Sequence, residues 1–231
     1  MPDDRDPLPT TSHRGLETPR AWSLRIRPME GRDIPAVVSL DRQVFADPWP
    51  ESAYVQEIYF NPHARYFILE GLESSYDYPA EGVRGWASRR RRPTARLLGF
   101  VGMRVERVSG HISTLAVHPD SRGQGLGELL LLLALDQAVQ DGAQTVSLEV
   151  RVSNEIAQRL YTKWRFSLRS RLHRYYANGE DAYLMQVHLY ADEAYGAEVQ
   201  AQLATLLADL NVNMERRRTV EQQSPPGEHD D

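Results

Sequence analysis

The stretch "HPDSRGQGLGELLLLLALDQA", from His118 to Ala138, places three glycines within five residues directly before a leucine-rich segment. Glycine permits backbone conformations that other residues avoid, and leucine favours a helix. The residues before it, "HISTLAV", are typical of a strand. We therefore expect a strand, a glycine loop and a helix, in that order. The first N–H groups of a helix have no acceptor within the helix and carry partial positive charge, so such a loop suits a bound diphosphate.

Two common phosphate-binding motifs do not fit this loop. The dinucleotide motif G-x-G-x-x-G requires a third glycine where this chain has Glu128 or Leu130, and a P-loop requires a lysine that is absent here. The pattern that remains is R-x-x-G-x-G, formed by Arg122, Gly125 and Gly127. Considered alone, it leaves two interpretations open: a phosphate-binding loop, or a simple glycine-rich turn into a helix.

Composition limits the possible classes of protein. With 231 residues, 41% of them hydrophobic, the chain predicts one domain with additional segments. It contains no cysteine, which excludes disulfides, thiol nucleophiles and cysteine zinc sites. The net charge of −5 argues against direct nucleic-acid binding. No apolar run approaches the roughly 20 residues of a membrane span, and no signal core is present, so we expect a soluble, cytoplasmic protein.

Sequence patterns divide the chain into a domain and four other segments. We predict a disordered tail at 1–21, a domain at 22–190 with a polar loop insertion at 72–95, an amphipathic helix at 191–216 and a disordered tail at 217–231. The insertion carries four consecutive arginines, 89–92. They form either a solvated loop or a contact to RNA or an acidic partner. The C-terminal helix packs either on its own domain or on a partner, and the oligomeric state stays open.

The order of predicted elements indicates the fold class. Alternating or continuous apolar patterns predict strands at 22–29, 64–70, 96–108, 111–119, 145–152, 166–177 and 181–190. Helical patterns lie at 33–45, with Asp33 as its N-cap, at 51–60, from the glycine loop to about 140, and at 154–164. This mixed order predicts an α+β fold, a mainly antiparallel mixed sheet with helices on both faces.

Candidate chemical groups follow in "LEVRVSNEIAQRLYTKWRF", residues 148–166. Leu148 and Val150 face the core side of a strand, so the carboxylate of Glu149 points the other way. Asn154 and Tyr161 are seven residues apart on the next helix and lie on nearly the same face. Each has a simpler explanation in isolation: a solvated strand charge for Glu149, a helix cap for Asn154, and core packing for Tyr161.

Together with the glycine loop, these segments resemble the GNAT acyl-CoA N-acyltransferase superfamily. Within it, the chain is most similar to the ribosomal-protein-alanine N-acetyltransferases. The resemblance rests on "ISTLAVHPDSRGQGLG", "LEVRVSN", "LY" at 160–161, "RYY" at 174–176, "EDAYLM" at 180–185 and "DPWP" at 47–50, and covers about 23–189. It implies the GNAT fold.

The resemblance also implies an enzyme that transfers an acetyl group directly from acetyl-CoA, in a ternary complex and without a metal. The expected acceptor is a protein α-amine, the N-terminal alanine of a ribosomal protein, and no membrane partner is expected. Glu149 would be the general base and Tyr161 the general acid. The pantetheine would lie along a splayed strand and the diphosphate in the glycine loop, contacting Leu115, Ala116, Val117, Arg122, Gly123, Gln124, Gly125, Leu126, Gly127, Glu128 and Asn154.

Two departures from the family pattern bear on this assignment. Arg165 stands where relatives usually have a glycine, and Glu128 puts a negative charge beside the expected phosphates, which requires its side chain to turn to solvent. Two alternatives stay open: the same chemistry on a lysine side chain or small amine, or a non-catalytic acyl-CoA-binding module. The acceptor groove is expected to involve Phe45, Trp49, Arg151 and Tyr176.

No rival catalytic site is evident in the sequence. A G-x-S-x-G nucleophile motif is absent, which disfavours a hydrolase. His111 and His118 are seven residues apart along a predicted strand and therefore lie on opposite faces, an arrangement that does not indicate a metal pair.

Overall fold

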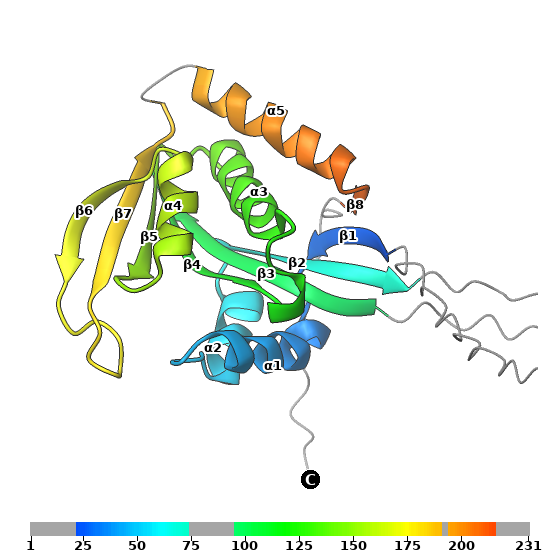
Figure 1. Ribbon diagram of the computed structural model, residues 1–231, viewed down its shortest axis with the longest axis horizontal. Coiled ribbons are helices and arrows are strands. Elements are labelled where there is room, and N and C mark those ends of the chain that lie inside the picture. Colours follow the sequence, from blue (N-terminus) through cyan, green and yellow to red (C-terminus); the bar gives the residue numbers. More distant parts are fainter. Residues whose placement is uncertain (1–21, 74–94, 191–193, 216–231) are drawn as a thin grey trace, which may run out of the picture.

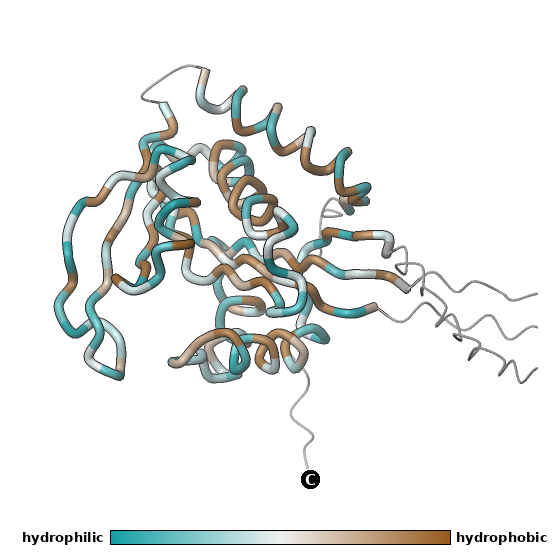
Figure 2. The backbone as a smooth tube through the Cα atoms, in the orientation of Figure 1, coloured by the Kyte–Doolittle hydropathy of each residue, from teal (hydrophilic) through white to brown (hydrophobic). Residues whose placement is uncertain are grey.

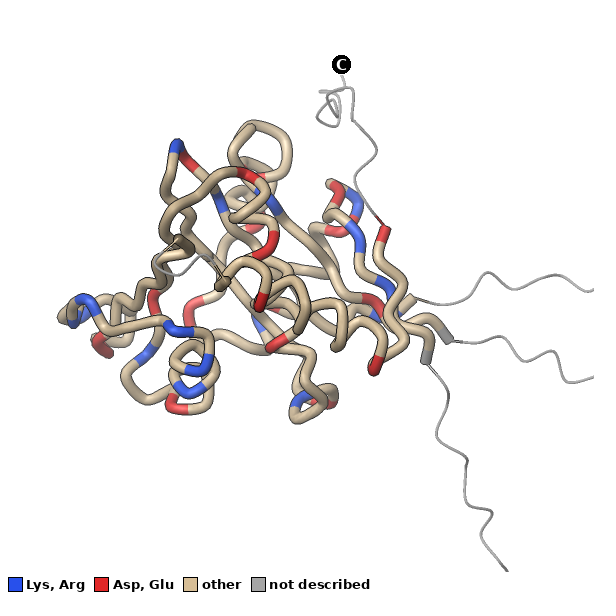
Figure 3. Tube along the Cα trace, turned by 90° about the horizontal axis from the view of Figure 1, so that it is seen from above, with Lys and Arg blue, Asp and Glu red and all other residues tan. Residues whose placement is uncertain are grey.

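The computed structural model describes residues 22–73, 95–190 and 194–215. Both predicted disordered tails, most of the 72–95 insertion and its four arginines lie outside the described residues. Within the described ranges, no helix is both long and apolar enough to cross a membrane. Acidic and basic residues are interspersed over this part of the chain (Figure 3).

One eight-stranded sheet runs through the molecule in the order β6-β7-β5-β4-β3-β2-β1-β8. Neighbouring strands are antiparallel except for the pairs β1–β8 and β4–β5, which are parallel. The strands are β1 Trp22–Pro28, β2 Ala64–Glu73, β3 Ala95–Glu106, β4 Ser109–Val117, β5 Thr145–Arg151, β6 Ser167–Leu172, β7 Ala182–His188 and β8 Val212–Met214.

Helices cover both faces of this sheet, with α1 and α2 on one side and α3 and α5 on the other (Figure 1). The predicted α+β fold with a mixed, mainly antiparallel sheet is thus confirmed. The helices are α1 Ile34–Val44, α2 Glu51–Val55, which continues as a π-helical turn η2 Gln56–Phe60, α3 Leu126–Gln140, α4 Glu155–Lys163 and α5 Ala194–Asp209; short 3-10 turns are η1 Gly31–Asp33 and η3 Pro119–Ser121.

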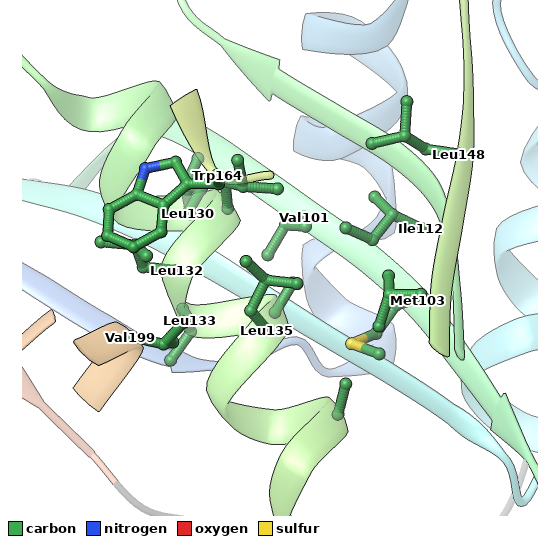
Figure 4. Close-up of a cluster of buried hydrophobic side chains, with 14 of the residues drawn as sticks. Val101, Met103, Ile112, Leu130, Leu132, Leu133, Leu135, Leu148, Trp164 and Val199 are labelled. Carbon is green, nitrogen blue, oxygen red and sulfur yellow. The ribbon is translucent and has the colours of Figure 1, made fainter. Parts of the chain in front are cut away.

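Helix α3 is the centre of the larger core. Its residues from Leu129 to Leu135 are each at most 4% exposed, and the helix is apolar around most of its circumference (Figure 2). A helix of this kind must be covered on more than one side. Side chains from β3, β4 and β5 point toward it on one side and Val199 of α5 lies on the other (Figure 4). This packing fixes the position of the α3 N-terminus, where the glycine loop begins.

The C-terminal segment packs on its own domain. Tyr195, Val199 and Leu203 of α5 are buried in the α3 core, and Gln200 donates a hydrogen bond to Asp136 at 3.1 Å. The helix ends at Asp209 rather than near 216. The apolar spacing through Met214 suits a helix, but residues Val212–Met214 instead pair with the edge of β1 as β8.

Asp33 does not use its side chain to cap α1. Its carboxylate accepts hydrogen bonds from the backbone N–H of Glu30, at 2.8 Å, and from Arg27, at 2.7 and 2.8 Å. Arg27 is only 7% exposed and also contacts Glu70. A buried guanidinium requires charged partners, and this need takes the Asp33 side chain away from the helix end.

Candidate active site

The glycine loop links η3 to α3 with two residues in the left-handed region. The φ angles of Gly123 and Gly125 are 75° and 80°, and a Cβ atom at either position would meet no other atom within 4 Å. The loop therefore leaves its backbone open to a ligand. The N–H groups of the first α3 turn, at Leu126, Gly127 and Glu128, have no acceptor within the helix. Arg122 differs, since its N–H donates to the carbonyl of Pro119 at 3.3 Å.

Strands β4 and β5 separate next to this loop. Their pairing covers Ser109 to Ile112 of β4 and ends at the pair Ile112–Leu148. On its other side β4 stays paired with β3 as far as Val117, with a register shift opposite Gly102. The backbone of β4 at 115–117 consequently has no β5 partner. This separation matches the splayed strand that the family resemblance implies, and it leaves backbone groups of β4 without a β5 partner.

Glu149 is the first β5 residue beyond the last β4–β5 pair. Its neighbours Leu148 and Val150 are buried, while the Glu149 side chain is 18% exposed on the opposite face, as the alternation predicts. The Nε2 atom of His111 lies 3.4 Å from Oε2 of Glu149. The Nδ1 atom of the same imidazole lies 3.2 Å from Oγ of Ser147.

Burial lowers the pKa of His111, and the charge of Glu149 acts in the opposite direction. The imidazole is therefore neutral at neutral pH, when it can share a proton or a water molecule with the carboxylate. Sequence reasoning missed His111 as a neighbour of Glu149. The only available signal was that both residues occupy non-core positions on strands, and the sequence does not show that β4 and β5 are adjacent.

Tyr161 lies on α4 and is 8% exposed. Its ring packs against that of Phe166, with centroids 5.8 Å apart. Burial raises the pKa of Tyr161 to about 12, and nearby Tyr176 adds to the effect. The phenol is therefore protonated at neutral pH, as a general acid must be. Core packing and a chemical role are compatible at this position.

Asn154 forms the N-cap of α4. Its side-chain oxygen accepts a hydrogen bond from the N–H of Ala157 at 3.2 Å. The helix-cap explanation is thus right for the oxygen of Asn154. This bond orients the side chain at the start of α4 and leaves the role of its amide nitrogen toward a cofactor as a prediction.

Arg151 joins two loops beside Glu149. Its guanidinium contacts Asp47, in the "DPWP" segment after α1, and Glu180, in the turn between β6 and β7, the latter at 2.8 Å. Its Cζ atom also lies 3.7 Å from the centroid of the Tyr176 ring. Arg151 was expected to line the acceptor groove, which stays a prediction, and its guanidinium is engaged in contacts within the protein. These contacts bring the two loops together next to the carboxylate of Glu149.

Each loop held by Arg151 has a second anchor. Buried Asp41 accepts hydrogen bonds from the backbone N–H of Trp49, at 2.6 Å, and from the hydroxyl of Tyr54, at 2.9 Å. Glu180 accepts from the N–H and hydroxyl of Ser153, and these bonds together with Arg151 lower the pKa of Glu180 to about 2. Sequence reasoning identified Trp49 but not the anchoring roles of Asp41 and Glu180, because no local pattern shows which backbone N–H a carboxylate will accept from.

The side chain of Glu128 does not turn to solvent, contrary to expectation. It is 17% exposed, and its Oε1 atom lies 2.6 Å from Nζ of Lys163 and 3.0 Å from Nε1 of Trp164. Its charge is thus compensated by α4 rather than by water. Its backbone N–H remains in the first turn of α3, where the prediction placed it.

Arg165 adopts the left-handed backbone conformation that favours glycine. Its φ angle is 61°, and the turn is closed by a hydrogen bond from the N–H of Phe166 to the carbonyl of Tyr161. Helix α5 supports this turn, since the hydroxyl of Tyr195 donates to the carbonyl of Trp164 at 2.9 Å and Arg165 pairs with Glu198 at 2.5 Å. These contacts offset the conformational cost of a non-glycine residue.

Groups of three or more His, Asp or Glu side chains able to hold a metal ion are absent from the described ranges. The carboxylate and imidazole at Glu149 and His111 form a pair only. The candidate site thus comprises a carboxylate–imidazole pair at Glu149 and His111, a buried phenol on α4, an unpaired edge of β4 and an open N-terminus of α3.

Comparison with known proteins shows which family the chain belongs to. The family model described as "Acetyltransferase (GNAT) family" matches residues 34–166. The chain belongs to the GNAT acetyltransferase family. It is accordingly an N-acetyltransferase, and the resemblance noted in the sequence is confirmed.

The chain is similar to several individual proteins of this family. The chain is 31% identical over 163 residues to a putative ribosomal protein bS18-alanine N-acetyltransferase of Bacillus subtilis, covering 70% of this chain and 93% of the relative. The ribosomal-protein-S18-alanine N-acetyltransferase of Escherichia coli superimposes with a TM-score of 0.56 at 26% identity, covering 71% and 93% of the two chains. NAA60 of Arabidopsis thaliana, solved with acetyl-CoA, gives a TM-score of 0.57 at 17% identity, covering 73% and 99%.

Proposed function

We propose that this chain transfers an acetyl group from acetyl-CoA to the α-amine of a protein N-terminus, with an N-terminal alanine of a ribosomal protein as the expected acceptor. The observation that carries the proposal is the position of Glu149, immediately beyond the point where β4 and β5 separate. A thioester held along the free edge of β4 would arrive beside this carboxylate.

The proposed cofactor contacts follow the shape of the site. The free backbone of β4 at 115–117 would pair with the amides of pantetheine. The N–H groups from Gly123 to Glu128 would bind the diphosphate, with Arg122 contributing its exposed side chain rather than its N–H. Asn154 would contact the cofactor from the start of α4. Bound in this way, acetyl-CoA supplies the activated acetyl group.

An α-amine acceptor suits a single carboxylate base. The pKa of a peptide α-amine is about 8 and that of a lysine side chain about 10.4, so at neutral pH the neutral α-amine costs about 1 kcal/mol and a neutral lysine nearly 5. Alanine has no amine in its side chain, so the acceptor nitrogen of the two alanine N-acetyltransferase relatives is an α-amine. This similarity supports the same acceptor class here.

Proton transfer is proposed to use the side chains of Glu149, His111 and Tyr161. Glu149 accepts the proton of the incoming ammonium, directly or through a water molecule held between it and His111. Tyr161, whose phenol is protonated at neutral pH, donates its proton to the thiolate as the C–S bond breaks. The second proton lost by the acceptor nitrogen, once its bond to the acetyl carbon has formed, restores the phenol. Arg151, by joining the loops that carry Asp47 and Glu180, shapes the entrance for the acceptor.

A panel of peptides that differ only in the first residue tests this function. Each peptide, carrying one internal lysine, is incubated with the protein and acetyl-CoA and analysed by tandem mass spectrometry. We expect acetylation of the α-amine, fastest on the peptide that begins with alanine. Acetylation of the internal lysine alone would support the side-chain alternative, and binding of acetyl-CoA without any transfer would support a non-catalytic module.

A further inference from the structure

Glu128 places a carboxylate in the first turn of the helix proposed to bind a diphosphate. It is the third residue of α3, which begins at Leu126. An acidic side chain there is favourable in the absence of ligand, because the helix N-terminus carries partial positive charge. Once a diphosphate occupies the same end, the two negative charges repel each other, and they do so more strongly where water is partly excluded. The sequence therefore contains an apparent conflict at Glu128.

Lys163 resolves this conflict from the neighbouring helix. Its Nζ atom lies 2.6 Å from Oε1 of Glu128, and the indole N–H of Trp164 donates to the same oxygen at 3.0 Å. The side chain of Glu128 is 17% exposed and that of Lys163 is 58% exposed. The Glu128 side chain is thus directed toward α4, with a positive charge in contact with it. Lys163 is also the one lysine in the whole chain.

We propose that Lys163 is a determinant of acetyl-CoA affinity that acts as the counter-charge of Glu128 and not as a ligand of the phosphates. This inference rests on the proposed function, since it assumes a diphosphate in the glycine loop. Loss of the positive charge at 163 leaves the Glu128 carboxylate free to repel that diphosphate. Loss of both charges removes the repulsion together with its compensation.

Four proteins and a control test this relationship by calorimetric titration with acetyl-CoA. We expect Lys163→Met to raise the dissociation constant about five- to tenfold at low salt, with a smaller effect at high salt. Glu128→Gln is expected to bind as tightly as the wild type or more tightly. The double variant Glu128→Gln/Lys163→Met should return to within about twofold of the wild type. Arg32→Met, which breaks the exposed pair with Glu30, controls for the loss of one positive charge elsewhere.

The double variant distinguishes a counter-charge role of Lys163 from direct contact between Lys163 and the phosphates. If Lys163 contacts the phosphates directly, the double variant will bind as weakly as Lys163→Met, and the counter-charge proposal is wrong. If Lys163→Met binds like the wild type, the proposal is also wrong. A wild-type protein that does not bind acetyl-CoA at all contradicts the proposed function itself, which distinguishes the two failures. Circular dichroism and thermal unfolding of each variant establish that it is folded before titration.

Chemical acetylation offers a second test, because it removes the positive charge of Lys163 from the wild-type protein. Acetic anhydride neutralises Lys163 as the only lysine side chain, together with the terminal amine, and mass spectrometry counts the modified sites. We expect the acetylated wild type to lose affinity for acetyl-CoA about as much as Lys163→Met does. Lys163→Arg treated in the same way keeps its positive charge at 163 and should keep its affinity. Equal losses in both proteins would contradict the proposal.

Discussion

The imidazole of His111 lies across the β4–β5 boundary from the carboxylate of Glu149, with Nε2 and Oε2 3.4 Å apart. The two strands are paired in parallel as far as Ile112 and Leu148. The contact between His111 and Glu149 therefore lies at the end of this pairing, where the strands separate. It places a proton acceptor and a neutral imidazole together at the point where a thioester would enter. The predictions below follow from this relationship and from the side chains around it.

Substitution of Glu149 by glutamine should stop the chemistry and spare cofactor binding. The amide keeps the shape of the side chain and cannot accept a proton, so we expect kcat/KM for an alanine-starting peptide to fall about a hundredfold or more. The dissociation constant for acetyl-CoA should change less than about threefold, because the diphosphate is proposed to bind at the glycine loop, away from Glu149. Steady-state kinetics and calorimetry measure the two quantities. Undiminished turnover would rule out Glu149 as the base.

Substitution of Tyr161 by phenylalanine should lower kcat with little effect on binding. The ring is buried against Phe166 and stays in place, so the variant is expected to fold. Only the hydroxyl is lost, and with it the proposed proton donor to the leaving thiolate, so we expect kcat to fall about tenfold or more. Pre-steady-state release of CoA, followed with a thiol reagent, measures the step concerned. Wild-type release rates would exclude the hydroxyl as the acid.

The stability of the protein should depend on pH through His111. Burial lowers the pKa of this imidazole in the folded state, whereas in the unfolded state it is about 6.5. The unfolded chain therefore binds the proton first as the pH falls below about 6.5, and the free energy of unfolding decreases from there toward the folded pKa.

Urea unfolding at pH 7.5 and 5.5 measures this effect. The decrease in the free energy of unfolding should be smaller in His111→Gln than in the wild type. His63→Gln, at an exposed position, should behave like the wild type. An identical decrease in all three proteins would show that His111 does not titrate differently on folding.

Replacement of Arg151 by methionine should affect the acceptor and not the cofactor. The variant removes the link between Asp47 and Glu180 and the stacking on Tyr176, while it keeps an aliphatic side chain. We expect the KM for the acceptor peptide to rise about tenfold or more, since small displacements of positioning groups are costly. The acetyl-CoA dissociation constant should stay constant. A rise confined to the latter would place Arg151 on the cofactor side instead.

The contact between α5 and the end of α4 should contribute measurably to stability. The hydroxyl of Tyr195 donates to the carbonyl of Trp164 in a buried position, and its removal in Tyr195→Phe leaves that carbonyl without this donor. We expect a loss of about 1–2 kcal/mol in the free energy of unfolding. Tyr190→Phe, at a residue that is 59% exposed, provides the matched control. Equal stability of both variants would mean that α5 does not support the turn at Arg165.

The sequence predicted those parts of the molecule that depend on local patterns. Alternation placed Glu149 off the core face, and the glycine spacing located the loop before α3. The same patterns mistook the end of the C-terminal segment for helix, because Val212–Met214 satisfies a helical period but pairs with β1. Asp33 was expected to cap α1, and the buried charge of Arg27 takes its carboxylate instead.

Sequence patterns could not predict contacts between segments that are remote in the sequence. The pairing of His111 with Glu149 depends on the order of strands in the sheet, and the ion pair between Glu128 and Lys163 depends on how α4 lies against α3. The contact between Asp47 and Arg151 similarly joins residues that are 104 positions apart in the sequence. In each case the residue types were visible, but the partner was not.

The most direct test of the central claim locates the acetyl group on one peptide. A peptide with a free N-terminal alanine and an internal lysine is incubated with acetyl-CoA and either the wild-type protein or Glu149→Gln, and the fragments are sequenced by tandem mass spectrometry. The account predicts an acetyl group on the alanine nitrogen with the wild type and almost none with the variant. Modification of the lysine alone, or equal modification by both proteins, would contradict it.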